Sequence, residues 1–221
     1  MPVIEFASVI PLPGVSPKEE ALVGLANHTI TSMTGAGINP VRFLLTNVRD
    51  ENNGGAERPV ISMMAVWPSK EKHAEFLAAG GPGESLAMLT QFITMGEAVF
   101  VPLEKDADEN QLALMAGKGI VSKVFRVKPE KVEEFESKTA GLVSANQDTV
   151  IAAWDIRDEG ESFVTSGELT RKALGEQSGA IPGTKNWVFI TGDEILARDV
   201  EDQTTGLFEK VEVRKWEGML D

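Results

Sequence analysis

The stretch from Val60 to Pro82 decides the fold, and it reads VISMMAVW, then PSKEKHAEFLAA, then GGP. Its first part is an apolar run bounded by Pro59 and Pro68, which predicts a β-strand, because proline is confined to the edges of strands. Ser69 is a good N-cap for a helix, and Gly80 followed by Gly and Pro is a typical helix end. The stretch therefore predicts a strand that leads within two residues into a short helix.

His73 lies on the apolar side of this predicted helix. It shares a stripe with Phe76 and Leu77 at positions i, i+3 and i+4, and such a stripe faces the sheet rather than water. An imidazole held there can act as a general base or as a hydrogen-bond donor to a substrate. A helix-face histidine can equally be satisfied by a backbone carbonyl and serve packing alone. His73 is the candidate catalytic residue, with both interpretations open.

Composition sets limits on the function. The chain has 221 residues, of which 42% are hydrophobic, as in one large or two ordinary globular domains. Its 34 acidic and 21 basic residues give a net charge of -13, which disfavours nucleic acid as a partner. With no cysteine and two histidines, no metal site is predicted. No apolar run approaches the length of a membrane span, so we expect a cytoplasmic protein without a membrane partner.

Apolar runs and turn residues divide the first half into alternating elements. A helix is expected after Ser16, and another follows the third strand. The predicted strands are Val3 to Ile10, Val41 to Val48, Val60 to Trp67 and Ala98 to Leu103. The order β-α-β-β-α-β is the split βαβ, or ferredoxin-like, arrangement. We assign residues 1–106 to a first domain, 107–117 to a charged linker, and 118–221 to a second domain.

The second half reads as a copy of the first. Its predicted strands are Gly119 to Val127, Thr149 to Ile156 and Ser162 to Gly167, with a short helix over Glu168 to Glu176 and an added strand over Leu207 to Trp216. Two short matches support a duplication. Asn47 to Glu51 (NVRDE) recurs as Asp155 to Glu159 (DIRDE), and Phe92 to Thr94 (FIT) recurs as Phe189 to Thr191.

This pattern resembles the dimeric α+β barrel superfamily, and particularly its antibiotic-biosynthesis monooxygenase-like group. The residues that carry the resemblance run from Trp67 through Ser69 and Glu71 to His73. The resemblance implies two ferredoxin-like halves that pack sheet to sheet into one pseudo-symmetric barrel within the chain. Haem-degrading relatives use an Asn in the first strand, and Val3 to Ile10 contain none, so no haem is expected. No phosphate-binding glycine loop follows a strand in this sequence, so no nucleotide cofactor is expected either.

Further candidate residues would bind the substrate. Trp67 and Trp154 are typical of core or pocket walls. Asn47 and Asp155 occupy equivalent strand ends and could face one cavity across a pseudo-twofold axis, although such residues usually form turns. Ser62 is a polar residue within a strand pattern, where alternation allows either solvent or a cavity.

Three classes of function remain open. The first is a small-molecule enzyme of secondary metabolism, a cofactor-independent monooxygenase acting on a phenolic or polyketide substrate that is hydrophobic or aromatic. The second is a polyketide cyclase, isomerase or dehydratase that uses the same pocket without oxygen. The third is a binding or structural barrel without catalysis. The sequence also leaves association into a homodimer open.

Overall fold

The computed structural model describes residues 1–50, 56–81, 88–103, 113–115, 119–156 and 184–220. Within these residues the chain forms two compact units. The first comprises residues 1–100 together with 218–220, and the second comprises 101–156 and 184–217. No helix among the described residues is long and apolar enough to cross a membrane.

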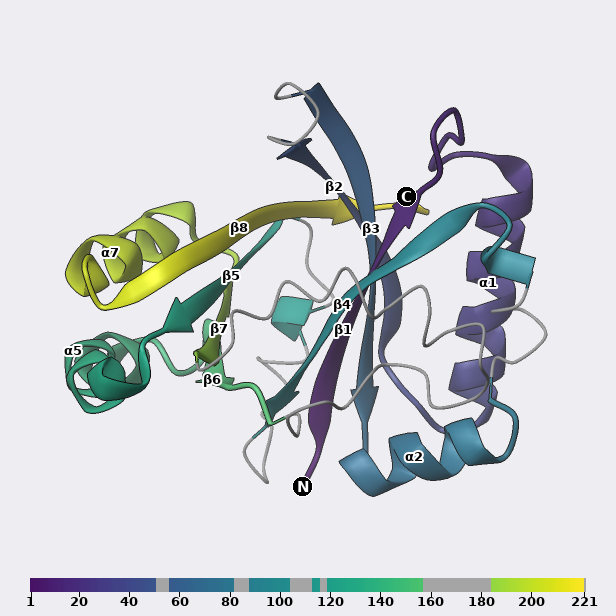
Figure 1. Ribbon diagram of the computed structural model, residues 1–221. Helices are drawn as coiled ribbons and strands as arrows, with labels where there is room; N and C mark the ends of the chain where they lie inside the picture. Colours follow the sequence, from purple (N-terminus) through teal and green to yellow (C-terminus); the bar gives the residue numbers. More distant parts are fainter. Residues whose placement is uncertain (51–55, 82–87, 104–112, 116–118, 157–183, 221) are drawn as a thin grey trace. The chain divides into compact units, whose positions relative to one another are not determined.

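The first unit has the predicted order β-α-β-β-α-β (Figure 1). Its elements are β1 (Val3–Pro11), α1 (Glu20–Gly35), β2 (Val41–Asp50), β3 (Ala56–Trp67), α2 (Lys70–Ala78) and β4 (Ile93–Pro102). The strands lie in the order β4-β1-β3-β2, with β3 antiparallel to both of its neighbours. This confirms an α+β fold and a ferredoxin-like arrangement of this unit.

The pairing of β1 with β3 determines which side chains share a face. Val3 lies opposite Trp67, and Glu5 lies opposite Ala65. Because successive side chains point to opposite faces, the odd-numbered residues of β1 share one face with Trp67. The helices cover this face, and Leu22 of α1 is buried with Val9 of β1 in one apolar cluster.

The second unit repeats the same topology. Its elements are β5 (Ile120–Val127), a 3-10 turn η2 (Pro129–Lys131), α5 (Val132–Ala145), β6 (Val150–Trp154), β7 (Lys185–Thr191), α7 (Glu194–Thr204) and β8 (Phe208–Gly218). The strand order β8-β5-β7-β6 is the same as that of the first unit when the strands are counted from β5. The predicted duplication of the ferredoxin-like unit is therefore present in the structure.

An aromatic cluster fills the core of the second unit. Phe125 and Phe135 are fully buried and lie 5.5 Å apart between ring centroids. Trp187 packs against both rings, at 5.7 and 5.1 Å. Aromatic pairs at these separations add to the stability gained from burying their surface. These buried rings form the hydrophobic core of the second unit, between its sheet and its helices.

The details of the second half differ from the sequence prediction. The predicted third strand, Ser162 to Gly167, and helix, Glu168 to Glu176, lie outside the described residues. Among the described residues the third strand of the unit is β7, and the strand at Phe208–Gly218 is the fourth rather than an addition. The prediction that Phe92 to Thr94 and Phe189 to Thr191 occupy equivalent places in the two units was wrong. The first segment lies at the start of β4, and the second lies at the end of β7.

The ends of the units also bear on the predicted domains. The last described residues group with the first unit, where the backbone N–H of Met219 donates to the carbonyl of Phe43 at 3.0 Å. The linker expected at residues 107–117 falls mostly outside the described ranges, and it stays a prediction. The sheet-to-sheet barrel likewise stays a prediction.

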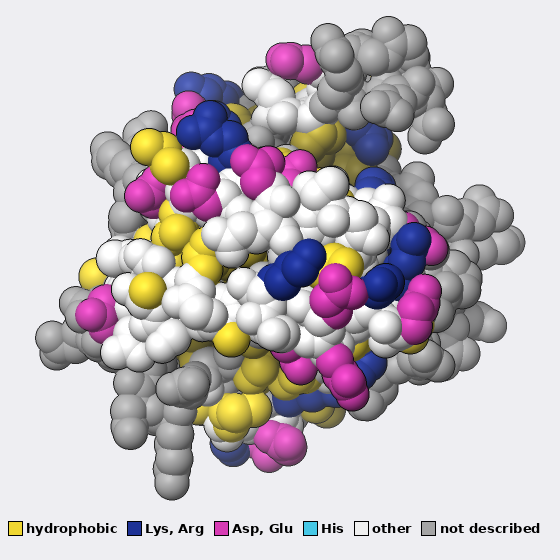
Figure 2. All heavy atoms as spheres, turned by 90° about the vertical axis from the view of Figure 1, so that its left-hand side faces the viewer, with side chains coloured by type: hydrophobic (Ala, Val, Ile, Leu, Met, Phe, Trp, Pro, Cys, Tyr) yellow, Lys and Arg dark blue, Asp and Glu magenta, His cyan; other side chains and the backbone are white. Residues whose placement is uncertain are grey.

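Acidic and basic side chains lie interspersed on the face of the molecule shown in Figure 2. In the second unit, Lys131 and Lys138 of the η2–α5 segment both approach Glu134, at 2.9 and 3.6 Å. The hydrogen bond from Lys131 and the positive charges of both lysines lower the pKa of the Glu134 carboxyl. Exposed pairs of this kind contribute little to stability.

Candidate functional site

Helix α2 places His73 against the sheet of the first unit. The hydroxyl of Ser69 accepts a hydrogen bond from the backbone N–H of Lys72 at 3.3 Å and starts the helix, as predicted. Gly80, with φ of +94°, follows the helix end in the left-handed region that glycine favours. His73 is 8% exposed, so the expected stripe does face the protein interior.

A buried carboxylate, Glu5 of β1, lies beside His73. Oε2 of Glu5 accepts a hydrogen bond from the indole N–H of Trp67 at 2.6 Å. Oε1 lies 3.6 Å from Nε2 of His73, which is an ion-pair distance but is too long for a hydrogen bond. Glu5 is completely buried. β1, β3 and α2 thus bring together a carboxylate, an indole and an imidazole.

The cost of burying Glu5 explains why these residues belong together. A carboxylate removed from water is unfavourable unless hydrogen bonds or an opposite charge compensate for it. Trp67 satisfies one oxygen, and His73 supplies a positive charge near the other when its imidazole is protonated. Among the described residues, Oε1 accepts no hydrogen bond. Trp67 therefore holds one carboxylate oxygen of Glu5, whereas the other is buried without a hydrogen-bond donor from these residues.

Aromatic rings hold the imidazole in place. The rings of Trp67 and His73 meet edge to face, with centroids 4.7 Å apart and planes at 82°. Phe100 of β4 contacts the imidazole at 5.0 Å, and Phe76 lies 5.4 Å from the indole. Such contacts fix the orientation of a side chain that would rotate freely in water.

A cavity opens beside this cluster, between the sheet and the helices of the first unit. Its volume is about 50 Å³, counted as the space open to the centres of water-sized spheres, and this is room for roughly three to five water molecules. Apolar side chains form nearly all of its wall. The polar residues among those lining it are Glu5, Thr29, Trp67 and His73, and the apolar ones include Val9, Leu22, Phe43, Met63, Phe76 and Leu77.

The other two predicted binding residues of the first unit lie away from this cavity. Ser62 is fully buried, but alternation along β3 places it on the opposite face of the sheet from Trp67. Asn47 is exposed and pairs with Pro59, eight residues along β3 from Trp67. The structure does not bring either residue to the imidazole of His73.

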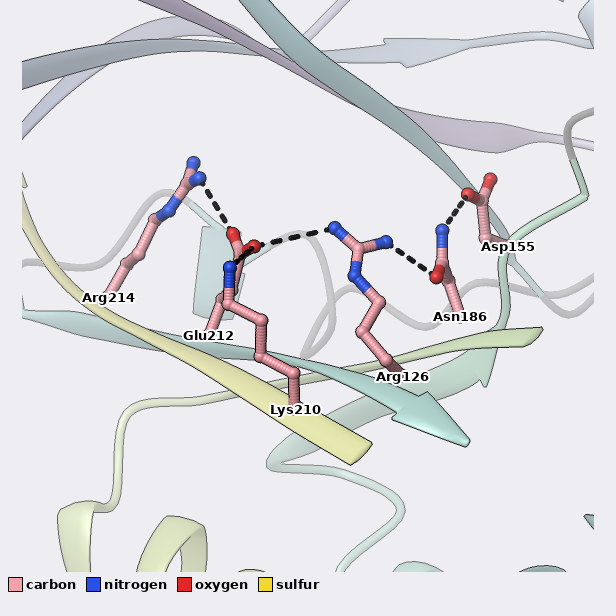
Figure 3. Close-up of polar contacts among 6 residues, drawn as sticks. All are labelled: Arg126, Asp155, Asn186, Lys210, Glu212 and Arg214. Atoms are coloured by element: carbon pink, nitrogen blue, oxygen red, sulfur yellow. Dashed lines mark hydrogen bonds and ion pairs between the residues drawn. The ribbon is translucent and has the colours of Figure 1, made fainter. Parts of the chain in front are cut away.

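Trp154 and Asp155 lie in the second unit. The indole N–H of Trp154 donates to Oε1 of Glu136 at 2.6 Å on the surface. Asp155 accepts a hydrogen bond from the side-chain amide of Asn186 at 3.2 Å. Asn186 in turn accepts from the guanidinium of Arg126, which is completely buried (Figure 3). Asp155 is thus part of a polar network rather than a simple turn former.

The same network continues to Glu212 on β8. Figure 3 shows its carboxylate between Arg126 and Arg214, with Lys210 beside it. Burial alone would raise the pKa of Glu212, but the guanidinium groups of Arg214 and Arg126 and the Lys210 ammonium outweigh it, and the pKa lies below its ordinary value. Glu212 is therefore the charged anchor of this cluster.

The second unit does not repeat the Glu5, Trp67 and His73 arrangement. Val3 pairs with Trp67 at the end of β3, and Val121 pairs with Thr191 at the end of β7. Helix caps follow two residues later in both units. The equivalents of the three residues are therefore Lys123, Thr191 and Ala197. Lys123 is buried and forms an ion pair with Glu201 of α7, so the carboxylate of the first unit is replaced by a cation.

Sequence reasoning missed Glu5. The residue stands alone as a charge within the apolar strand VIEFASVIP. The available signal was alternation, because a carboxylate at this position shares its face with Val3, Ala7 and Val9, which are all buried. A charge on an otherwise apolar strand face indicates a partnered or functional group.

Comparisons with known proteins identify the fold. The chain matches no protein-family model and no curated protein sequence. Among solved structures it is similar to a provisionally named monooxygenase from Fusobacterium nucleatum (TM-score 0.57, 10% identity, 99% of this chain and 92% of that one). It is also similar to a provisionally named monooxygenase from Lactobacillus acidophilus, with a TM-score of 0.50 and 9% identity over 99% of this chain and 94% of that one. A third similar structure is chlorite dismutase from Candidatus Nitrospira defluvii, solved with imidazole. Its TM-score is 0.50, with 11% identity over 99% of this chain and 92% of that one. These likenesses support the fold over nearly the whole chain.

Haem does not fit the residues of this cavity. Haem iron takes an axial His, Cys, Met or Tyr ligand, and the chain contains neither Cys nor Tyr. His28 is exposed on α1, and the cavity beside His73 is far smaller than a porphyrin. Within the described parts of the chain, no group of three or more His, Cys, Asp or Glu side chains is placed to hold a metal ion.

Proposed function

We propose that the chain is an enzyme that removes a proton from a small, mostly apolar molecule, with His73 as the general base. The observation that carries this proposal is that Nε2 of His73 lies 3.6 Å from Oε1 of the fully buried Glu5 at the wall of an apolar cavity. A purely structural core rarely buries a carboxylate of which one oxygen accepts no hydrogen bond, because the desolvation cost exceeds what packing gains.

The proton transfer follows from the geometry. Nε2 of His73 takes the proton, and the imidazolium that forms then lies 3.6 Å from the negative charge of Glu5. This charge stabilises the product of the transfer, because the surrounding apolar wall weakens solvent screening. Trp67 keeps Glu5 in position through the hydrogen bond to Oε2. A positioned base typically accelerates a reaction by about 10² to 10⁴.

As the specific reaction, we propose a cofactor-independent monooxygenation. A deprotonated phenol or 1,3-dicarbonyl is electron-rich and can donate electrons to O₂ directly. The CH₂ between the two carbonyls, or the ring CH₂ of a phenol in its keto tautomer, is then oxidised to C=O. One atom of O₂ enters the product and the other leaves as water with the two hydrogens of that CH₂, so that no external reductant is required. The names of two of the structural neighbours accord with this chemistry. Cyclisation or isomerisation would begin with the same proton transfer but would consume no oxygen.

The cavity limits the substrate that we propose. Its apolar wall suits a hydrophobic or aromatic molecule, and the net charge of -13 disfavours nucleic acid as a partner. A polycyclic polyketide is larger than this cavity. We therefore propose a smaller substrate than the resemblance implies, and we attach no metabolic pathway to it.

The test is oxygen consumption with a panel of small phenols and 1,3-dicarbonyls. We expect His73→Gln to lower turnover about 100-fold or more, because glutamine retains much of the size but cannot take up the proton. His28→Gln is the matched control, since this second histidine is exposed on α1.

The outcome also separates the alternatives. Turnover that does not need oxygen would favour an isomerase or cyclase. An active His73→Gln variant with an unchanged melting temperature would remove His73 from the mechanism. No turnover with any substrate, together with a cavity that binds nothing, would favour a non-catalytic barrel.

A further inference from the structure

The free oxygen of Glu5 says more about the substrate than the proposed reaction does. Oε2 is occupied by the indole N–H of Trp67, whereas Oε1 accepts no hydrogen bond from any described residue. The side chain is 0% exposed, so bulk solvent does not satisfy this oxygen. An unsatisfied buried carboxylate oxygen costs several times more than an unsatisfied neutral group. Something else must supply the missing donor.

The surroundings of Oε1 restrict what that donor is. Glu5 lines the cavity, and the wall around it is almost entirely apolar. Nε2 of His73 lies 3.6 Å from Oε1, and His73 lines the same cavity, so a donor that reaches Oε1 also lies beside the proposed base. A ligand that fits must therefore present one hydrogen-bond donor toward Glu5 and an apolar body toward Leu22, Phe43 and Leu77.

The cavity volume sets the size of that body. Room for roughly three to five waters corresponds to about 90–150 Å³ of liquid, and an engineered apolar cavity of about 150 Å³ binds benzene. A single aromatic ring matches this space. Its charge is restricted too, because a ligand carboxylate would meet the negative charge of Glu5 in a poorly screened site.

We propose that Glu5 selects the ligand: the cavity binds neutral molecules of about one ring that carry a hydroxyl or N–H donor, and it rejects carboxylates. This inference deepens the proposed function and rests on it for the location of the site, but it does not depend on the reaction. Glu5 thereby has two roles, as acceptor for the ligand through Oε1 and as the counter-charge for His73.

Calorimetric binding of phenol, toluene and benzoate to the full chain tests the proposal. The three probes have similar bodies and differ in the group presented to Glu5. We expect phenol to bind more tightly than toluene, although water solvates phenol better, and we expect no detectable binding of benzoate. Hydrogen bonds to charged acceptors contribute about tenfold or more to affinity.

Two variants locate the effect at Glu5. In Glu5→Gln an amide oxygen can still accept from Trp67, so the N–H₂ group faces the cavity. We expect phenol to bind about tenfold more weakly and toluene to change less than about twofold. Glu75→Gln, at an exposed glutamate of α2, is the control and should change neither affinity.

Several results would overturn the proposal. They are equal affinity of the wild type for phenol and toluene, binding of benzoate as tight as that of phenol, no binding of either neutral probe, and an equal loss of phenol and toluene affinity in folded Glu5→Gln. If that variant does not fold, the ranking of the three probes by the wild type still decides. Selective phenol binding without oxygen uptake or proton exchange would leave this inference standing and would refute the proposed function alone.

Discussion

Trp67→Phe should destabilise the protein strongly, and it should do so through Glu5. The substitution removes the indole N–H that donates to Oε2 at 2.6 Å, and it leaves a fully buried carboxylate without a described hydrogen bond. Breaking a buried charged interaction from one side costs about 3–5 kcal/mol. For a chain of this length that corresponds to a fall in melting temperature of about 6–20 °C. Urea unfolding followed by far-ultraviolet circular dichroism measures the change.

A double-mutant cycle assigns the loss to the pair. In a Glu5→Met background there is no buried carboxylate that could lose its hydrogen bond. Trp67→Phe should therefore lower the free energy of unfolding by at least about 2 kcal/mol less than it does in the wild type. Trp154 provides the matched control, because its N–H donates to Glu136 at the same 2.6 Å on the surface. The coupling there should stay below about 1 kcal/mol. If the losses of unfolding free energy in the two single variants add up to that of the double variant within about 0.5 kcal/mol, Trp67 and Glu5 are not coupled and the prediction is wrong.

Three further predictions concern the rest of the molecule. Glu212→Gln should lower the free energy of unfolding by about 3 kcal/mol at neutral pH, because the buried guanidinium of Arg126 loses its ion pair with Glu212. The depressed pKa of Glu212 stabilises the fold above the unfolded carboxyl pKa and is lost as pH falls through the folded one, so acid titration of both proteins should show their difference shrinking below about pH 4.5. Asp193→Ala removes the cap of α7 and should cost about 1 kcal/mol in thermal unfolding, while phenol affinity is unchanged. Phe135→Ala empties the aromatic core and should cost about 3–5 kcal/mol in urea unfolding.

The part of the site that could be predicted from the sequence is the local part. Pro59, Pro68 and Ser69 act on their own backbone, so the end of β3 and the start of α2 were readable from neighbouring residues. The burial of His73 follows from helical spacing and was also confirmed. Its catalytic role stays a prediction.

The partner of His73 is non-local and could not be read in this way. Glu5 meets Trp67 across 62 residues of sequence, and only the register of β1 against β3 brings them together. The strand β7 of the second unit was not predicted, for a related reason. The match of Phe189 to Thr191 with Phe92 to Thr94 aligns this segment with the residues before the fourth strand of the first half, whereas in the structure it is the end of β7. Arg126 illustrates the same limit, since alternation allowed both solvent and interior.

The replacement of Glu5 by Lys123 at the equivalent position has a consequence for how such a site is inherited. A homodimer built from one ferredoxin-like unit carries every substitution twice, because both copies come from one sequence. A carboxylate at a given strand position then implies two carboxylates, and a lost imidazole implies two lost imidazoles. Joining the units in a single chain removes this constraint. One half can hold an anion and the other a cation at matching places, so that a reaction centre can disappear from one half without disappearing from the protein.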